Sequence, residues 1–205
     1  MIKDLLFDLG GVIMDIRRSD CVAAFKALGM EDPECFLGEY VQAGPFGDLE
    51  SGAISPEEFR MAIRKYLPKE TTDEQIDTAL NRFLTGIPAH RLEALRKLRK
   101  RYGIYMLSNT NPIMWQHDIK RYFQAEGLER EDYFDGMITS FEARTMKPGS
   151  EIFRYAIDKC GLNPETTLFI DDSQANLDAA EALGFATMLV PPGSEFDKLL
   201  KERGL

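Results

Sequence analysis

The stretch LLFDLGGVIMD, residues 5–15, joins an apolar run, a carboxylate, two glycines, a second apolar run and a second carboxylate. A run that is apolar throughout is typical of a strand covered on both faces, as in a parallel sheet. Asp8 ends this run, and the permissive glycines that follow let the chain turn directly after the carboxylate. Such an aspartate either caps the turn or presents a carboxylate for chemistry, and the rest of the sequence decides between these roles.

Three further runs share this apolar character, and each is bounded by glycine, proline or polar residues. They are GIYMLSNTN at 103–111, TTLFIDDSQ at 166–174 and FATMLVPPG at 185–193, with a weaker run, GMITS, at 136–140. Helical patterns lie between these runs, at residues 88–103, 148–161 and 173–184. Strands that alternate with helices predict a doubly wound α/β domain built on a parallel sheet.

Residues 16–85 interrupt this alternation, because they contain several helix signatures and no convincing strand. SPEEF at 55–59 has the serine, proline and glutamate of a capping box that begins a helix, and TDEQ at 72–75 repeats the pattern. SDCVAAFKALG at 19–29 and DPECFLGEYV at 32–41 predict two earlier helices. We therefore expect two domains, a core formed by residues 1–15 and 86–205 and a four-helix insertion at residues 16–85.

The composition is that of an ordinary globular protein and narrows the range of partners. The chain has 205 residues, of which 44% are hydrophobic and 29% charged. Its net charge of -9 argues against a nucleic-acid or anionic-membrane binder, because both need a basic surface. We expect a cytoplasmic protein, because the three cysteines form no CxxC pair and the sequence shows no secretory signal and no segment of transmembrane length. We expect it to be a monomer or a weak homodimer.

Polar side chains that can do chemistry follow the predicted strands. They are Asp8, Ser108, Asn109, Lys147, Asp171 and Asp172. Each has an ordinary explanation by itself, as a turn residue, a strand-end cap or a surface lysine. Ligands of open α/β sheets bind beyond the carboxyl ends of the strands, so together these residues mark one edge of the sheet as a site.

Three carboxylates at one edge repel one another unless a cation lies among them. Mg²⁺ is the natural cation, because it combines a few carboxylates with phosphate oxygens and water. Lys147 and Ser108 would complement the remaining charge of a phosphoryl group. The residues therefore predict a phosphoryl-transfer site, at which positioning and charge stabilisation do most of the catalysis.

These motifs resemble the four motifs of the haloacid dehalogenase superfamily, in their usual order and across the whole chain. The matching residues are Asp8 after the first strand, Ser108 in LSN, Lys147 in KP, and Asp171, Asp172 and Asn176 in DDSQAN. The resemblance implies a Rossmann-like three-layer core with a parallel sheet, and residues 16–85 resemble the helical C1 cap of this superfamily. FDLGGVIMD and LESGAISPEEF are most similar to bacterial sugar-phosphate phosphatases of the alpha-glucose-1-phosphate phosphatase type.

The resemblance implies a Mg²⁺-dependent phosphatase that hydrolyses a small phosphomonoester, with a sugar phosphate favoured. Asp8 would be the nucleophile that forms an aspartyl-phosphate intermediate, and Lys147 would be the second catalytic residue. The segment at 43–53 would lie over the pocket and help to select the substrate, or it would be a plain interhelical loop. The implied metal ligands are Asp8, the carbonyl of Gly10, Asp172 and Asp171. The implied phosphate-binding residues are Ser108, Asn109 and Lys147, with Asn176 supporting the metal loop.

Gly10 departs from most phosphatases of this superfamily, which carry a second aspartate at this position. That aspartate protonates the leaving oxygen and later activates water, and its loss costs roughly 10²–10⁴-fold in rate for a poor leaving group. One interpretation is a phosphatase whose substrate needs little protonation, such as an anomeric sugar phosphate. One alternative is a catalytically weak phosphate-binding or regulatory protein. The other is a 2-haloacid dehalogenase, although the retained acidic pair, Asp171 and Asp172, argues against it.

Gly10→Asp tests whether a proton donor is what the chain lacks. If so, the variant turns over substrates with poor leaving groups faster than the wild type, because the new carboxyl supplies the missing acid. Steady-state phosphate release from alkyl and aryl phosphates measures the difference. An unchanged rate would indicate that another group, such as Asp15 or a side chain of the inserted helices, already donates the proton.

Overall fold

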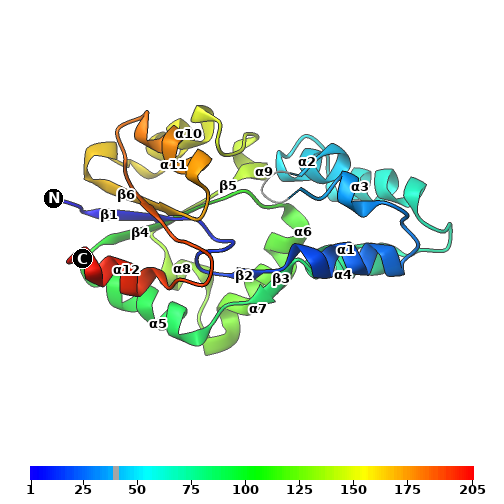
Figure 1. Cartoon of the computed structure of the whole chain (residues 1–205), viewed down its shortest axis with the longest axis horizontal. Helices are drawn as coiled ribbons and strands as arrows, with labels where there is room; N and C mark the ends of the chain where they lie inside the picture. Colours follow the sequence, from blue (N-terminus) through cyan, green and yellow to red (C-terminus); the bar gives the residue numbers. More distant parts are fainter. Residues whose placement is uncertain (39–41) are drawn as a thin grey trace.

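A five-stranded parallel sheet forms the centre of the computed structural model, which describes residues 1–38 and 42–205 (Figure 1). Its order is β5-β4-β1-β6-β7, and every neighbouring pair is parallel. The predicted α/β fold is confirmed, and the weak run at 136–140 contributes an edge strand. The strands are β1 (Asp4–Phe7), β4 (Gly103–Ser108), β5 (Gly136–Thr139), β6 (Thr167–Asp171) and β7 (Ala186–Leu189).

Helices cover both faces of the sheet, so the core has three layers (Figure 1). One face carries α5 (Ala89–Leu98) and α12 (Phe196–Glu202), and the other carries α10 (Ser150–Cys160) and α11 (Gln174–Glu181). Phe7 of β1 packs on Phe196 of α12 with ring centroids 5.1 Å apart, whereas the preceding Leu6 belongs to the cluster beneath α10 and α11. Because both faces are apolar, the strands read in the sequence as continuous apolar runs.

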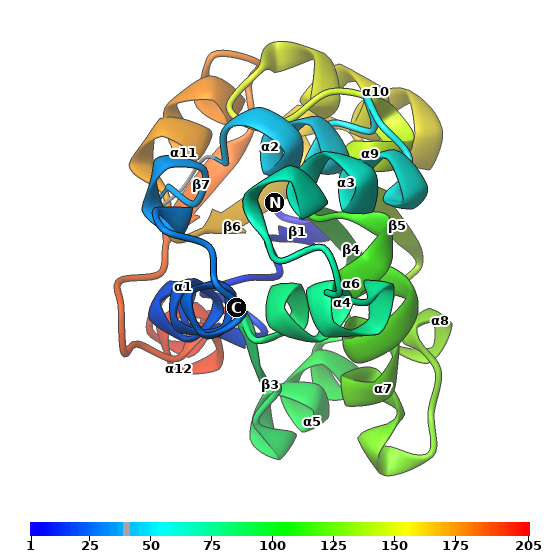
Figure 2. The ribbon, with the colours of Figure 1, turned by 90° about the vertical axis from the view of Figure 1, so that its right-hand side faces the viewer.

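Four α-helices of the inserted segment gather at one end of the sheet (Figures 1 and 2). Both predicted capping boxes form, each with a 3.2 Å hydrogen bond from a backbone N–H to the hydroxyl of the cap residue. Phe46 lies between Phe25 and Phe59, with ring centroids 5.3 and 5.2 Å away, so the predicted helical cap has its own aromatic centre. The helices are α1 (Arg18–Ala27), α2 (Gly44–Glu50), α3 (Pro56–Ile63) and α4 (Asp73–Asn81).

The predicted helix at residues 32–41 is wrong over its described part. The structure has only a 3₁₀ turn at Pro33–Cys35, after which Leu37 forms an isolated antiparallel bridge with Gln42. Arg18 donates a hydrogen bond to the carbonyl of Leu37, which removes that carbonyl from the helical ladder. Gly38 follows directly and disfavours a helix on entropic grounds. The remainder of the predicted helix, residues 39–41, lies outside the described residues.

Two short strands connect the inserted helices to the core. β2 (Asp15–Ile16) and β3 (Leu84–Gly86) pair in an antiparallel ladder where the chain leaves the core and returns to it. The sequence pattern predicted no strand here, because two or three residues are too few to show a period of two. The pairing holds both crossings of the chain side by side.

Among the described residues, no helix is both long and apolar enough to cross a membrane.

Short helical segments complete the fold, most of them between β4 and β5. The shorter α-helices are α6 (Pro112–Met114), α7 (Lys120–Phe123), α8 (Arg130–Tyr133) and α9 (Ser140–Ala143), with a π-helical segment at Trp115–Ile119. Further 3₁₀ turns lie at Arg64–Tyr66, Gln124–Glu126 and Pro164–Thr166.

Arg91 of α5 ties the turn after β1 to the far end of the chain. This buried guanidinium donates to Asp15 at 2.7 Å, to the carbonyl of Ile13 at 3.3 Å and to Glu195 at 2.8 Å. The hydrogen bonds from Arg91 lower the pKa of Glu195 to about 2, so this carboxylate stays ionised at any ordinary pH. Arg91 therefore clamps the loop that carries the first motif between α5 and α12.

Arg91→Ala should lower the free energy of unfolding by about 2–3 kcal/mol, because it leaves a partly buried carboxylate without its strongest partner. Lys97→Ala on the same helix is the matched control, since it removes only an exposed pair with Glu93. We expect less than about 1 kcal/mol from that control. Urea unfolding measures both changes, and equal losses in the two variants would contradict the role given to Arg91.

Candidate active site

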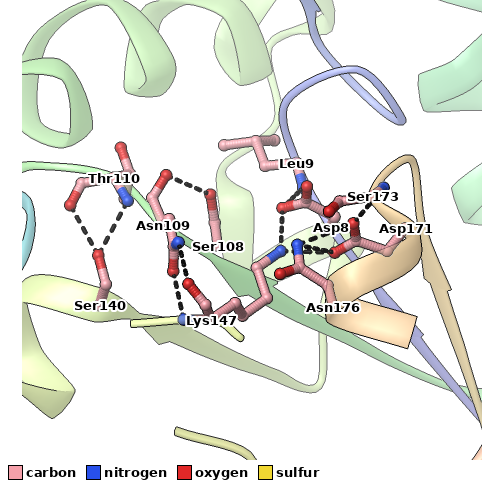
Figure 3. A network of polar contacts seen from close by, with 10 residues as sticks. All are labelled: Asp8, Leu9, Ser108, Asn109, Thr110, Ser140, Lys147, Asp171, Ser173 and Asn176. Atoms are coloured by element: carbon pink, nitrogen blue, oxygen red, sulfur yellow. Dashed lines mark hydrogen bonds and ion pairs between the residues drawn. The ribbon is translucent and has the colours of Figure 1, made fainter. Parts of the chain in front are cut away.

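The carboxyl ends of three adjacent strands bring the predicted site residues together. Asp8 follows β1 directly, while Ser108 and Asp171 are the last residues of β4 and β6. In the parallel register Phe7 lies opposite Met106 and Ile170, so the residues that follow leave the sheet at one edge. Figure 3 shows the polar network that they form with Lys147, which comes from the segment between α9 and α10.

Lys147 is the centre of this network. It is 3% exposed, and its Nζ lies 2.8 Å from Oδ1 of Asp8 and 2.7 Å from Oδ2 of Asp171. Asn109 fixes the backbone of Lys147, because its side-chain amide donates to the lysine carbonyl at 3.0 Å and accepts from the lysine N–H at 2.9 Å. Both ends of the Asn109 amide are thus occupied, so its side chain positions Lys147.

The two adjacent aspartates after β6 have different surroundings. Asp171 is fully buried, and both of its oxygens accept hydrogen bonds, from Ser173 N–H, from Asn176 and from Lys147. The carboxyl of Asp172 is less buried and lies against Gly11, where an added Cβ would be 2.2 Å from its Oδ2. Gly11 also has a φ of +75°, so both the backbone and the space beside Asp172 require glycine at this position.

The electrostatics of the site are those of an acidic cluster with too little positive charge. Burial raises the pKa of Asp8 to about 7, against the lowering effect of Lys147, and the nearby Asp171 and Asp172 raise it further. Burial and the charge of Asp171 raise the pKa of Asp172 to about 6. Burial disfavours the charged form of Lys147, but Asp171 and Asp8 outweigh it and raise the lysine pKa. One ammonium among three carboxylates leaves room for a cation.

The donor set fits a hard divalent cation. Asp8, Asp171 and Asp172 each offer a carboxylate oxygen, and these atoms lie within 4.8 Å of one another. The second oxygen of Asp8 accepts no hydrogen bond from the described residues, whereas its Oδ1 is held by Leu9 N–H at 2.7 Å. Oxygen ligands of this kind suit Mg²⁺ better than softer metals.

A cavity of about 260 Å³ lies above the cluster, between the core and the inserted helices. Asp8, Gly10, Ser108, Asn109, Lys147, Asp172 and Asn176 all line it, whereas Asp171 lies behind Lys147 and does not. The inserted segment contributes two polar side chains: Gln42, which precedes α2, and Glu50, the last residue of α2, which falls in the predicted segment at 43–53. The remaining wall is largely apolar and includes Met14, Ile16, Phe83, Leu84, Met114 and Ile119.

Two features of this site were missed from the sequence. The apolar wall comes from three separate segments, around residues 14–16, 83–84 and 114–119, and nothing in any one of them marks it as cavity lining. Glu50 shares α2 with one other acidic residue, Asp48, which is exposed, and the sequence context does not distinguish the two. Both features depend on how the inserted helices sit over the sheet.

Known proteins are similar to this chain in sequence and in fold over nearly its whole length. The sequence model for haloacid dehalogenase-like hydrolases matches residues 2–184. A D-ribitol-5-phosphate phosphatase of Bacteroides thetaiotaomicron is 37% identical over 196 residues, which cover 96% of this chain and 95% of that protein.

Solved structures show the same similarity. The haloacid dehalogenase family enzyme bt-2542 of Bacteroides thetaiotaomicron, an aspartate-to-alanine variant in complex with magnesium and inorganic phosphate, superposes with a TM-score of 0.93 at 39% identity and covers 98% of this chain and 99% of its own. A HAD-like family hydrolase from Porphyromonas gingivalis superposes with a TM-score of 0.91 at 37% identity and covers 99% and 98%.

Asp172→Asn should stabilise the protein in a chelating buffer. The raised pKa values of Asp8 and Asp172 mean that the fold binds protons between about pH 8 and 5, whereas unfolded carboxyls bind them only near pH 4. The stability of the wild type therefore rises as the pH falls through this window. At pH 8 we expect a gain of about 1 kcal/mol for the variant, or roughly 2–4 °C in Tm, and a shallower pH dependence.

Asp158→Asn is the control for this comparison, because it removes an exposed carboxylate from α10. Thermal unfolding followed by circular dichroism at several pH values measures all three proteins. An Asp172→Asn variant that melts below the wild type at pH 8 would show that carboxylate repulsion is not what strains the site.

Proposed function

The chain belongs to the haloacid dehalogenase-like hydrolases, and we propose that it is a Mg²⁺-dependent phosphatase of a small phosphorylated sugar or sugar alcohol. The observation that carries this proposal is the Asp8–Lys147 pair beside two further carboxylates, at the floor of a cavity between the core and the inserted segment. Two similarities support it: a D-ribitol-5-phosphate phosphatase is similar in sequence, and a structure solved with magnesium and inorganic phosphate is similar in fold. A cavity of about 260 Å³ suits a small phosphomonoester.

Asp8, Asp172 and the carbonyl of Gly10 would hold the metal ion. Asp171 is saturated by hydrogen bonds from three groups, so we assign it to the orientation of Lys147 and to a contact with the metal through water. The bound cation would supply positive charge for the phosphate oxygens and relieve the repulsion within the acidic cluster.

Asp8 would attack the phosphorus atom with the oxygen that no described residue holds. Leu9 N–H and Lys147 fix the other oxygen, so the nucleophile is oriented before the substrate arrives. The attack gives an aspartyl phosphate, and water then hydrolyses it. Lys147 and Ser108 would bind the phosphate oxygens, and Asn109 would contribute through the position that it gives to Lys147.

The inserted helices would act as a cap that opens to admit the substrate and closes to exclude water. We place the domain boundaries at residues 1–15 and 86–205 for the core and 16–85 for the cap. The paired crossings β2 and β3 lie at these boundaries, and a change in their backbone angles would move the cap as one body.

Dehalogenation is not favoured by this site. A halide leaves without a proton and needs no metal, so a dehalogenase has no use for three carboxylates around a buried lysine. The proposal of a weak phosphate-binding protein makes a different prediction, because it requires phosphate binding without turnover.

Phosphate release from sugar phosphates, sugar alcohol phosphates, nucleotides and phosphorylated acids tests the proposal directly. We expect turnover of at least one sugar or sugar alcohol phosphate with Mg²⁺, loss of turnover with a chelator and recovery when Mg²⁺ is added back. Asp8→Asn should reduce kcat by more than about 10³-fold, because the amide cannot act as the nucleophile. Asp158→Asn should behave as the wild type.

Two outcomes would overturn the proposal. Activity that survives the chelator, or that is unchanged in Asp8→Asn, would contradict the mechanism. Binding of inorganic phosphate without turnover of any substrate would favour the regulatory protein instead.

A further inference from the structure

The proposed reaction needs a proton donor, and the core does not supply one at the usual position. Gly10 has no side chain, and Asp15 points away from the cavity to a 2.7 Å ion pair with Arg91. A sugar alcohol phosphate has an ordinary alcohol as its leaving group, so expulsion without a proton is slow. An acid for this alcohol must therefore come from another part of the cavity wall.

Four of the described residues that line the cavity have titratable side chains: Asp8, Glu50, Lys147 and Asp172. Three of them belong to the proposed nucleophile, phosphate and metal sites. We propose that the fourth, Glu50 at the end of α2, is the general acid that protonates the leaving oxygen. This inference rests on the proposed phosphatase function, and it assigns to the cap a step that the core of related enzymes performs.

The position of Glu50 is fixed by contacts between the cap and the core. Ser140 Oγ donates to the carbonyl of Glu50 at 2.6 Å, and the same hydroxyl accepts from Thr110 N–H at 3.0 Å. Thr110 follows Ser108 and Asn109, so a single serine links the end of α2 to the proposed phosphate-binding loop. Two residues on, an added Cβ at Gly52 would lie 2.2 Å from the carbonyl of Phe141, which shows how closely the cap backbone approaches α9.

Glu50 and Asp8 reach the same cavity from different parts of the structure, one from the cap and the other from the core, and this arrangement suits an in-line displacement. Asp8 lies on the floor of the cavity, at the end of β1, whereas Glu50 reaches the same cavity from the cap. In phosphoryl transfer the attacking and leaving oxygens lie on opposite sides of the phosphorus atom. A substrate whose phosphate rests on Lys147 and Ser108 therefore directs its leaving oxygen toward the cap.

The surroundings of Glu50 keep its carboxyl protonated near neutral pH. Its carboxyl makes no hydrogen bond or ion pair with any other described residue, and burial raises its pKa to about 8. The titratable and charged groups that face it are the Cys21 thiol of α1, with Asp8, Lys147 and Asp172 across the cavity. The neighbouring helices α3 and α9 carry further charged residues: Glu57, Glu58, Arg60 and Glu142.

The proton balance of the proposed step closes on Glu50. As the oxygen of Asp8 bonds to phosphorus, the bond from phosphorus to the leaving oxygen breaks, and the Glu50 proton moves to that oxygen to give a neutral alcohol. The resulting Glu50 carboxylate takes a proton from the water that attacks the aspartyl phosphate. The bond from phosphorus to Asp8 then breaks, which releases inorganic phosphate and restores the carboxylate of Asp8 and the acid form of Glu50.

Glu50→Gln distinguishes proton donation from a contact with the hydroxyls of the substrate. Phenyl phosphate and p-nitrophenyl phosphate lack such hydroxyls and differ in the acidity of the leaving phenol. We expect kcat/KM to fall by about 10²–10⁴-fold for ribitol 5-phosphate, by a smaller factor for phenyl phosphate and by less than about 5-fold for p-nitrophenyl phosphate. Asp48→Asn, an exposed change of the same kind on α2, should leave all three rates unchanged.

The pH dependence of kcat/KM is a second test of the proposal. Wild-type kcat/KM for ribitol 5-phosphate should fall as the pH rises through about 8, because the acid form of Glu50 is lost. Glu50→Gln should lack this descending limb, since glutamine does not titrate. A contact with substrate hydroxyls alone would raise KM without removing the limb.

Gly10→Asp in the Glu50→Gln background is the rescue experiment. An added Cβ at Gly10 would meet only two Ile16 methyl groups at 3.5 Å, so the core can take an aspartate at this position. We expect the double variant to recover at least about 10-fold of the rate that Glu50→Gln loses on ribitol 5-phosphate.

The results separate failure of the inference from failure of the proposed function. If Glu50→Gln slows all three substrates equally, or leaves all three unchanged, in an enzyme that is otherwise an active Mg²⁺-dependent phosphatase, Glu50 is not the acid. If the wild type hydrolyses no sugar or sugar alcohol phosphate with Mg²⁺, the proposed function fails and the inference fails with it.

Discussion

The buried ammonium of Lys147 between Asp8 and Asp171 is the interaction on which the site depends. A lysine that is 3% exposed is tolerated only with charged partners at close range, here at 2.8 and 2.7 Å. Residues around Lys147 hold the lysine and its partners in this orientation. Asn109 holds the backbone of Lys147, and Ser173 N–H and Asn176 hold Asp171. The positive charge of Lys147 thus connects the ends of β1 and β6, and Asn109, which follows β4, holds the lysine backbone beside them.

This arrangement leaves an excess of negative charge. The excess favours binding of a cation and lowers the stability of the fold when no cation is bound. Asp8 and Asp172 have raised pKa values because they are buried near other carboxylates, so their ionised forms oppose folding when no cation is present. Active sites commonly retain strain of this kind, since the groups that bind a ligand are unsatisfied without it. A divalent cation would offset this excess, because its two positive charges and the Lys147 ammonium together balance three carboxylates.

The inserted helices of the cap also contribute to the cavity. Residues of the cap line part of the cavity and include Glu50, while the proposed nucleophile and phosphate-binding residues belong to the core. The proposed acid belongs to the cap, so it would be in place only when the cap is closed, and closure would then be coupled to chemistry. Ser140 sits at this junction, because it bonds both Glu50 of the cap and Thr110 of the phosphate loop.

The sequence by itself determined the family, the parallel sheet, the capping boxes and the group of residues at one edge of the sheet. These features follow from local patterns: continuous apolar runs, capping residues and polar residues directly after strands. The helix expected at residues 32–41 was wrong in its described part, because a tertiary hydrogen bond from Arg18 to Leu37 overrides the local pattern. The two crossings β2 and β3 were too short to show a pattern at all.

The tertiary structure alone decided which residue of each motif faces the cavity. Asp171 and Asp172 are adjacent in the sequence, yet the first is buried behind Lys147 and the second lines the cavity, because successive residues at a strand end point in opposite directions. Glu50 and Asp48 lie on the same short helix, but only Glu50 lines the cavity over the sheet. Burial depends on contacts between segments distant in the chain, so no local pattern could have identified Glu50.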